Sequence, residues 1–324
     1  MKRDIQKILV IKLSALGDFV LALAAMKHIR QVHAGAHITL LTTPPFEALA
    51  RACPYFDAVE IDGKPKGIKA WWDLRKRIKA ARFDRVYDLQ TSAASSRIFN
   101  LLRPFPPEWS GIAWGCQLPH KNPHKDGMHT LERQADQLKY AGIWPDAPTR
   151  PGSAPPPDLA WIAASEPASR PLAAGVQPRP YVMIIPGGSA HRLDKRWPAE
   201  KFAALSRHFY SQGFDVVVIG GPQETRLARV IQQAVPQARD LTGRTDFARV
   251  ALIGARAALV VGNDTGPLHL AAAAGARTIV LFSKASDPAL SAPRGHVLVL
   301  QAENLADLDV AQVAQAASTL GVLQ

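Results

Sequence analysis

The chain has 324 residues, 47% of them hydrophobic and 20% charged, which is typical of a soluble globular protein with two domains. Its longest apolar runs fall far short of the roughly 20 residues of a membrane-spanning helix, and no signal peptide is expected. Two cysteines without metal-ligand or redox spacing favour a cytoplasmic protein. The net charge of +12 is uneven, because residues 1–150 hold 23 Lys and Arg against 14 Asp and Glu. This half is expected to meet an anionic partner, which leaves a phosphorylated substrate, an anionic membrane or a nucleic acid open.

Short apolar strands alternate with helices along most of the chain. In the first half, the spacing predicts strands at 7–13, 37–43, 58–62 and 83–90 and helices at 18–33, 45–53 and 130–141. Ten prolines between residues 144 and 180 indicate an interdomain linker, with room for a short helix at 158–165. In the second half, strands are expected at 181–186, 214–220, 237–241, 257–262, 277–282 and 296–300, and helices at 198–212, 223–234, 246–254, 267–274 and 304–319.

This alternation predicts an α/β protein of two Rossmann-like, doubly wound lobes. We expect an N-terminal domain over residues 1–150, a Pro-rich linker over 151–180 and a C-terminal domain over 181–324. For the last helix, packing back against the first lobe is left open as an alternative. Ligands of such sheets bind beyond the carboxyl ends of the strands, so a central cleft that both lobes face is the expected site.

The stretch GNDTGPLHLAAAAG, residues 262–275, joins a predicted strand to a helix. The turn would expose the backbone N–H groups of Thr265 and Gly266 at the positive end of the helix dipole, which is a ready anion site. His269 follows on the first helical turn. The structural alternative is that Asp264 or Thr265 caps the helix and His269 is a satisfied, partly buried histidine.

Another predicted strand ends in PGGS, residues 186–189, and a basic loop leads on to KRWP, residues 195–198. Ser189 as a hydroxyl donor and Lys195 as a cation are candidates to bind a diphosphate. The alternative is a solvated basic loop in front of a helix that begins with a proline.

Two features of the first half also have both a functional and a structural interpretation. Asp18 follows the first strand, where a carboxylate either caps a helix or faces the cleft as a general base. The run 64–85 holds nine Lys and Arg against two Asp. It is either a solvated helix face or a docking face for an anionic membrane or a phosphorylated glycolipid. The residues proposed to bind such an acceptor are Lys64, Lys66, Lys69 and Arg75.

No P-loop and no G-x-S-x-G elbow occurs in the sequence. The sequence DLD at 307–309 imitates a metal-binding motif but falls inside the predicted last helix, where we expect it to face solvent. A metal site is therefore not predicted.

The motifs at Gly17-Asp18, at PGGS…KRWP and at GNDTGPLHLAAAAG, in this order, resemble glycosyltransferase family 9, the bacterial lipopolysaccharide heptosyltransferases. The resemblance extends from about residue 7 to residue 283. It implies a GT-B fold in which the C-terminal lobe binds a nucleotide-sugar, expected to be ADP-heptose, and the N-terminal lobe binds the acceptor. The implied acceptor is the lipid-A-linked inner core of lipopolysaccharide. It would place a peripheral enzyme on the anionic, cytoplasmic face of the inner membrane.

The resemblance also implies roles for single residues. Asp18 would be the general base of an inverting transfer, while Lys195 and the Thr265–Gly266 turn would hold the diphosphate. Glu224 would lie near the ribose. A helix dipole and an ammonium group stabilise the leaving group without a metal, so no metal and no cofactor are expected. The donor-binding residues implied by the family are Ser189, Lys195, Glu224, Asp264, Thr265, Gly266 and His269.

Other functions stay open at this point. A nucleotide-sugar epimerase of the same fold would need no acceptor, and some members of the family use other sugars. A bilobed binding protein is disfavoured by the lack of an expected signal peptide. Nucleic acid is not an expected partner, because the sequence contains no recognisable binding module for it.

Overall fold

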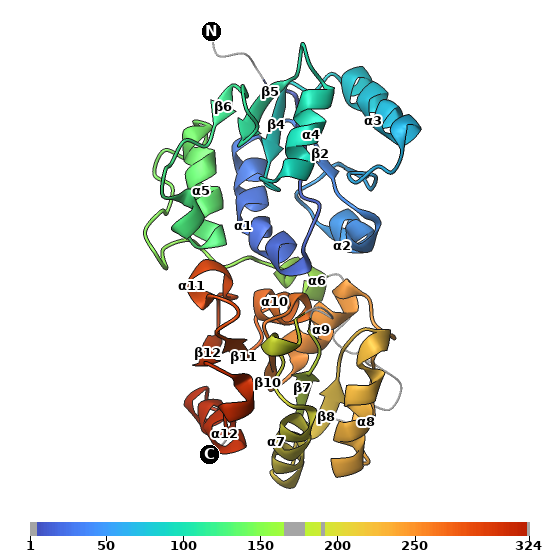
Figure 1. Cartoon of the computed structure of the whole chain (residues 1–324), viewed down its shortest axis with the longest axis vertical. Helices are drawn as coiled ribbons and strands as arrows, with labels where there is room; N and C mark the ends of the chain where they lie inside the picture. The colour runs from blue at the N-terminus through green and yellow to red at the C-terminus, as the bar shows by residue number, and fades with distance from the viewer. Residues whose placement is uncertain (1–4, 165–178, 189–191, 323–324) are drawn as a thin grey trace. The chain divides into compact units, whose positions relative to one another are not determined.

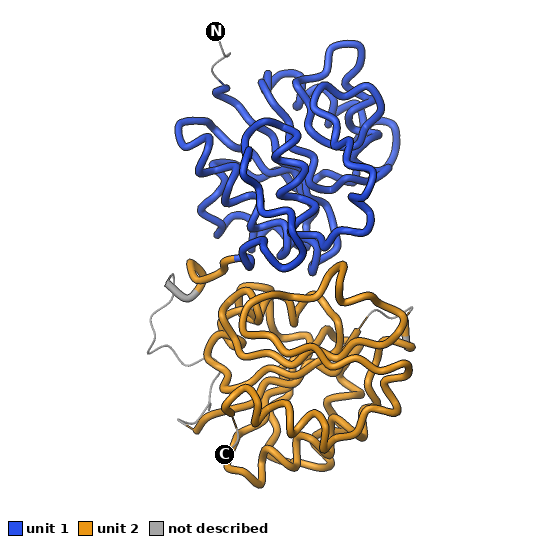
Figure 2. The backbone as a smooth tube through the Cα atoms, turned by 90° about the vertical axis from the view of Figure 1, so that its left-hand side faces the viewer, with its two compact units in different colours: residues 1–157 blue, residues 158–324 orange. Residues whose placement is uncertain are grey.

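A computed structural model describes residues 5–164, 179–188 and 192–322 of the chain. The chain forms two compact units, residues 1–157 and residues 158–324, which Figure 2 draws in blue and orange. The expected linker at 151–180 contains the boundary between these units, and its residues 165–178 lie outside the described part.

Unit 1 is a parallel six-stranded sheet with the strand order β3-β2-β1-β4-β5-β6 (Figure 1). Its strands are β1 (Lys7–Ile11), β2 (His37–Leu41), β3 (Ala58–Glu60), β4 (Arg85–Asp88), β5 (Glu108–Gly111) and β6 (Leu118–Pro119). Its α-helices are α1 (Leu16–Val32), α2 (Glu47–Ala52), α3 (Ile68–Ala81), α4 (Ala93–Leu101) and α5 (Thr130–Tyr140), and its 3-10 turns are η1 (Pro44–Phe46) and η2 (Lys125–Gly127).

Unit 2 repeats this arrangement, with the strand order β9-β8-β7-β10-β11-β12 when it is followed in the same direction. Its strands are β7 (Tyr181–Ile185), β8 (Asp215–Val218), β9 (Arg239–Asp240), β10 (Leu259–Asn263), β11 (Thr278–Ser283) and β12 (Val297–Ala302). Its α-helices are α6 (Ala160–Ala164), α7 (Ala199–Ser211), α8 (Thr225–Ala234), α9 (Phe247–Arg256), α10 (Gly266–Ala273), α11 (Pro288–Ser291) and α12 (Val310–Thr319). The 3-10 turns are η3 (Leu193–Lys195), η4 (Pro222–Glu224) and η5 (Leu305–Asp307).

Both sheets reverse their strand order at one point, between β1 and β4 in unit 1 and between β7 and β10 in unit 2. The connections leave these neighbouring strands in opposite directions, so a crevice opens at their carboxyl ends. The predicted fold class of two doubly wound, Rossmann-like lobes is confirmed by this topology. In each unit, the loops that follow these two strands are therefore the expected position of a ligand site.

The central strands are buried on both faces, as expected for parallel strands that are covered by helices. Ile8, Leu9, Val10 and Ile11 of β1 are wholly buried. In unit 1, α3 and α4 pack together with one set of strand side chains, while α1 packs against α5. In unit 2, α7, α8 and α12 contribute to one core. The last helix, α12, accordingly packs on α7.

The structure corrects the expectation for the last helix. The predicted helix at 304–319 is divided, because η5 ends at Asp307 and α12 begins only at Val310. Asp309 is the N-cap of α12 and forms a capping box with Gln312. Aspartate competes for backbone N–H groups and therefore favours a helix start over a helix interior. Elements α4, β5, β6 and α11 were not predicted; the two strands are only 4 and 2 residues long.

Helices α9 and α10 approach each other closely on account of two small residues. A Cβ atom added at Gly254 would lie 2.6 Å from the Cβ and 2.9 Å from the Cα of Ala271, which is wholly buried. The alanines of α10 thus allow a close helix contact, and this contact fixes the helix whose first turn follows β10.

We expect Gly254→Ala to destabilise unit 2 by about 1–3 kcal/mol, because overpacking outweighs the gain in helix propensity of about 1 kcal/mol. Urea unfolding measures this change. Gly35→Ala is the control, because nothing lies within 4 Å of the Cβ it would add. Equal stability of the two variants would show that the close contact is not a constraint.

Candidate functional site

The loops after β7, β8 and β10 enclose a cavity of about 350 Å³ in unit 2. Its polar side chains come from Glu224, Asp264 and Thr265, while glycines supply much of the remaining wall. The cavity lies where the strand order of the sheet reverses, which is the usual ligand position in a doubly wound sheet. Four of the seven residues predicted to bind the donor therefore line one cavity: Glu224, Asp264, Thr265 and Gly266.

A group of three polar side chains stands beside this cavity. Lys195 Nζ lies 3.3 Å from Asp264 Oδ2, and His269 Nε2 lies 3.7 Å from Asp264 Oδ1. Burial alone would raise the pKa of the Asp264 carboxyl. The interaction with His269 and the charge of Lys195 outweigh burial and hold that pKa below its usual value. Asp264 is therefore ionised at neutral pH and able to orient both neighbours.

The first turn of α10 presents hydrogen-bonding groups that have no partner within the described residues. Thr265 occupies the N-cap position, but its side chain makes no capping hydrogen bond and its buried Oγ1 atom is unpaired there. His269 is 4% exposed, and its Nδ1 atom likewise lacks a partner in the described ranges. A buried polar atom without a partner costs free energy, so these atoms suit a bound polar ligand. The predicted alternative of a Thr265 side-chain cap is wrong for this structure.

Glycines make room for the side chain of Glu224. Cβ atoms added at Gly187 and Gly220 would lie 2.6 Å and 2.8 Å from Glu224 side-chain atoms. Any larger residue at these positions would displace the carboxylate or fill the cavity. Glu224 ends η4 and lines the cavity wall, as a ribose-binding carboxylate would.

Asn263 is one residue of this site that the sequence interpretation missed. Its wholly buried side chain accepts a hydrogen bond from Trp197 N at 2.9 Å and donates to the carbonyls of Pro186 and Gly187 at 2.9 and 3.1 Å. One amide thereby fastens both ends of the loop that carries Lys195. The signal in the sequence was a polar side chain at the end of an otherwise apolar strand.

Arg196 also escaped prediction. Its Nη2 atom donates to the Gly188 carbonyl at 2.6 Å, while its buried Nε atom has no partner among the residues that the structure describes. The guanidinium therefore stands beside a cavity-lining glycine with a donor to spare. Ser189, the remaining predicted donor residue, lies outside the described residues.

Asp18 lies on the first turn of α1, at the carboxyl end of β1. Its Oδ2 atom accepts a hydrogen bond from Ala15 N at 3.3 Å, so the capping interaction is present. Lys64 Nζ donates to Ser14 Oγ at 2.8 Å, which brings this predicted acceptor residue to the same loop. A cap and a general base are compatible, because a carboxylate has four lone-pair positions and the cap uses one.

The other predicted acceptor residues differ in how available they are. Lys66 and Lys69 are exposed. Arg75 is half-buried; its Nε atom donates to the Leu101 carbonyl at 2.9 Å and its guanidinium lies over the Trp72 ring. Part of its hydrogen-bonding capacity is thus used inside unit 1, whereas the two lysines are exposed to solvent.

A buried ammonium group lies close to the Asp18 loop. Lys12, which follows β1, is 3% exposed, and its Nζ atom donates to the Leu89 carbonyl at 3.3 Å. Burial lowers the pKa of Lys12 to about 8, against the opposing charges of Asp18 and Asp88. Burial raises the pKa of Asp88 to about 6. The carboxyl ends of β1 and β4 therefore concentrate titratable groups in the interior of unit 1.

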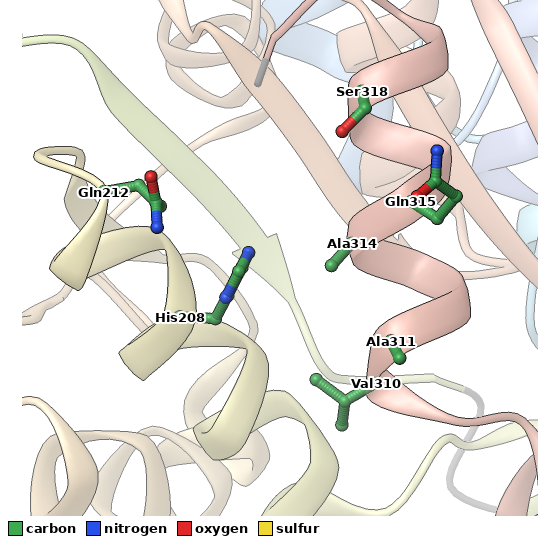
Figure 3. Close-up of a pocket in the computed structure, with 7 residues that line it drawn as sticks. All are labelled: His208, Gln212, Val310, Ala311, Ala314, Gln315 and Ser318. Carbon is green, nitrogen blue, oxygen red and sulfur yellow. The ribbon is translucent and has the colours of Figure 1, made fainter. Parts of the chain in front are cut away.

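A second hollow of unit 2 lies between α7 and α12 and measures about 480 Å³ (Figure 3). Its lining residues are His208, Gln212, Val310, Ala311, Ala314, Gln315 and Ser318. The lining holds no carboxylate, lysine or arginine. It therefore lacks the lysine or arginine that would neutralise the charge of a diphosphate.

Within the described ranges, no group of three or more His, Cys, Asp or Glu side chains could hold a metal ion. Metal independence stays a prediction. Across the same ranges, no helix combines the length and the apolar character needed to cross a membrane.

The two doubly wound units place this protein in the GT-B class of folds. Three solved structures are similar to almost the whole chain. A family 9 glycosyl transferase from Veillonella parvula has a TM-score of 0.77 and 20% identity, over 99% of this chain and 98% of its own. Escherichia coli ADP-heptose lps heptosyltransferase II has a TM-score of 0.77 and 21% identity, over 97% of this chain and 98% of its own. E. coli heptosyltransferase WaaC with ADP has a TM-score of 0.76 and 20% identity, over 97% of this chain and 100% of its own.

A family model described as glycosyltransferase family 9 (heptosyltransferase) matches residues 71–309. The chain belongs to this family of glycosyltransferases, so both the predicted family and the predicted enzyme class are confirmed.

Curated relatives match it over different lengths. E. coli lipopolysaccharide heptosyltransferase 3 is 33% identical over 32% of this chain, and the match covers 31% of the relative's own length. The lipopolysaccharide core heptosyltransferase OpsX of Haemophilus influenzae is 20% identical over 85% of this chain and 78% of its own length. For several of these relatives, the chain matches only about a third of the relative's own length.

The buried Lys12 leads to a prediction about pH. The pKa of this residue is about 8 in the folded chain and near 10.5 in the unfolded chain, so between these values the unfolded state binds more protons. Stability from this group therefore rises with pH across that window. We expect the difference in unfolding free energy, wild type minus Lys12→Met, to rise by about 1–3 kcal/mol between pH 7.5 and 10. Parallel stability curves from urea unfolding would contradict the buried charge.

Proposed function

We propose that the protein transfers a heptose from ADP-heptose to the inner core of lipopolysaccharide, with inversion and without a metal ion. The observation that carries this proposal is the group formed by Lys195, Asp264 and His269 beside the first turn of α10. It combines a cation, a helix N-terminus and polar atoms that have no partner among the described residues, beside one cavity. These are the groups that bind and stabilise a diphosphate leaving group.

The donor would occupy unit 2 with its diphosphate over Thr265 and Gly266. Lys195 would neutralise the phosphate charge, and Glu224 would accept hydrogen bonds from ribose hydroxyls. Asp264 would orient Lys195 and His269 rather than contact the phosphates, because two anions repel each other. A relative from E. coli, with 20% identity, has been solved with ADP-2-deoxy-2-fluoro heptose, which makes ADP-heptose the first donor to test.

Asp18 would be the general base. Its carboxylate takes the proton of the acceptor hydroxyl as that oxygen forms a bond to the anomeric carbon of the donor. The bond between the anomeric carbon and the β-phosphate oxygen breaks, and its electron pair leaves with ADP. Attack opposite to the leaving group inverts the anomeric centre. Proton transfer by a positioned carboxylate contributes about 100- to 10,000-fold to such rates.

The acceptor would bind unit 1, with Lys64 at the Asp18 loop and the exposed Lys66 and Lys69 beyond it. Phosphate groups on an inner-core acceptor would pair with these ammonium groups. The same basic face would attract the anionic cytoplasmic surface of the inner membrane, at about 1 kcal/mol per lysine or arginine near the surface. We therefore propose peripheral attachment at that surface.

A transfer assay tests the function directly. Purified protein is incubated with ADP-heptose, with and without a truncated lipopolysaccharide acceptor, and products are followed by mass spectrometry. Acceptor that gains one heptose, with release of ADP, is the expected result. Isomerised nucleotide-sugar in the absence of acceptor would favour an epimerase, and transfer from a different donor would correct the sugar.

Asp18→Asn removes the base but retains an oxygen for the Ala15 cap. We expect kcat to fall at least about 100-fold, while the Kd for ADP stays within about twofold. Asp146→Asn, at an exposed position, is the matched control and should leave both values unchanged. Near-normal turnover by Asp18→Asn would rule out this base.

Lys195→Met removes the ammonium at the diphosphate position. We expect the Kd for ADP, measured by calorimetry, to rise about 10- to 100-fold, as for a lost charge-assisted hydrogen bond. Arg229→Met removes an exposed charge from α8 and serves as the control. If Lys195→Met bound ADP as tightly as that control, the proposed phosphate role would be refuted.

A further inference from the structure

Gln90 links two loops at the carboxyl ends of the unit 1 strands. It follows β4, and its side-chain Oε1 atom accepts hydrogen bonds from Leu13 N at 2.8 Å and from Ser14 N at 3.1 Å. Leu13 and Ser14 belong to the loop between β1 and α1. One side-chain oxygen therefore binds two successive backbone N–H groups of the loop that leads to Asp18.

The loop that presents Gln90 is itself well fixed. The wholly buried Asp88 accepts hydrogen bonds from Gln90 N at 3.1 Å and from Thr91 N at 3.0 Å through its Oδ1 atom. Thr91 has φ of 44°, in the left-handed region that a β-branched residue seldom adopts. Such a conformation persists where surrounding contacts enforce it, and it clusters at functional sites. Lys12 Nζ adds a hydrogen bond to the Leu89 carbonyl of the same loop.

The far side of the Asp18 loop is held as well. Thr43 Oγ1 donates to the Leu13 carbonyl at 3.0 Å, and Lys64 donates to Ser14 Oγ. From Ser14 the chain passes to Ala15, whose N–H binds the Asp18 carboxylate. Gln90 thus acts on the backbone four and five residues before Asp18, without a hydrogen bond to Asp18 itself within the described part of the chain.

The same device occurs in unit 2. There Asn263, at the end of β10, fastens the loop after β7, and β10 occupies the sheet position that β4 occupies in unit 1. In both units, a side-chain amide from the fourth strand of the topology crosses the strand-order reversal to the loop of the first strand. In unit 2 that loop carries Lys195, and in unit 1 the corresponding loop leads to Asp18.

We propose that Gln90 is a positioning residue, whose amide oxygen sets the place of the Asp18 carboxylate through the backbone of Leu13 and Ser14. This inference rests on the proposed role of Asp18 as the base. Placement matters for the rate, because a shift of about 1 Å in a reacting group costs on the order of 100-fold. A loop held by one side chain less would sample positions from which the carboxylate does not reach the acceptor hydroxyl.

Gln90→Met tests the inference, because methionine has nearly the same length without the acceptor oxygen. We expect kcat to fall about 10- to 100-fold, with the KM for acceptor and the Kd for ADP within about threefold of wild type. Gln90→Glu keeps an oxygen at the same reach and is expected to recover at least half of the lost rate on a logarithmic scale. A merely structural role would lower the melting temperature and leave kcat per folded enzyme unchanged.

Amide hydrogen exchange supplies a readout that needs no substrate. In Gln90→Met, the amides of Leu13 and Ser14 are expected to exchange at least about tenfold faster, since the loss of one hydrogen bond of about 1.4 kcal/mol corresponds to tenfold. Gln232→Met is the matched control, since its side chain donates to a backbone carbonyl on the outer part of unit 2. It should alter neither kcat nor these two amides.

Two results would overturn the inference: a kcat of Gln90→Met within twofold of wild type, or unchanged exchange at Leu13 and Ser14. Failure of the proposed function is recognisable separately, because the wild-type protein would then transfer no heptose or Asp18→Asn would keep its activity. Faster exchange in Gln90→Met together with an active Asp18→Asn would reject Asp18 as the group being positioned, and with it the inference.

Discussion

The proposed donor site depends on the hydrogen bonds of one buried amide, that of Asn263. It joins the end of β10 to the two ends of the loop after β7, with one accepted and two donated bonds. Together with the bond from Arg192 Nη2 to the Ala285 carbonyl, these bonds hold the loop that places Lys195 near Asp264 and the first turn of α10. A fully satisfied amide can be buried at little cost, while one left without partners would cost about 1–3 kcal/mol. The amide therefore stabilises the loop after β7 and, through this loop, helps to place Lys195 beside Asp264.

The carboxylate of Asp264 stands between two nitrogen-bearing side chains beside the cavity. Its oxygens lie 3.3 Å from Lys195 Nζ and 3.7 Å from His269 Nε2. The ionised carboxylate therefore holds the ammonium of Lys195 close to the first turn of α10. In the proposed function, that ammonium and the helix N-terminus would be the donors that meet the diphosphate. Preorganised donors of this kind stabilise a leaving group without reorganisation at the moment of reaction.

Much of the architecture could be predicted, because alternating apolar strands and helices define a doubly wound sheet and a Pro-rich segment marks the boundary. Lys195, Asp264 and His269 were predicted to bind the donor for a related reason, since they follow strand ends, where such sheets bind ligands, and their role stays a prediction. The short β5 and β6, with the sequences EWSG and LP, were missed because neither contains a run of β-branched apolar residues.

The tying residues could not be predicted from the sequence. Gln90 and Asn263 are ordinary amides whose partners are distant backbone atoms, 76 to 77 residues away for Gln90 and 66 to 77 residues away for Asn263. Local spacing contains no information about which distant loop such an amide meets. Arg75 was expected to face the acceptor for its charge, but its contact with Leu101 shows that a basic residue is also used for packing. A run of basic residues indicates which face of the protein is basic. The contacts that each residue makes within the protein decide whether its charge can bind a ligand.

The most direct test of the account is a hydrogen-exchange footprint of ADP on the intact protein. Saturating ADP should slow exchange in peptides that contain Gly187 and Gly188 and in those that contain Thr265 and Gly266, where backbone N–H groups would meet the diphosphate. Peptides of α7 and α12 should be unaffected. Protection confined to α7 and α12, with none in the loops after β7 and β10, would contradict the placement of the donor site.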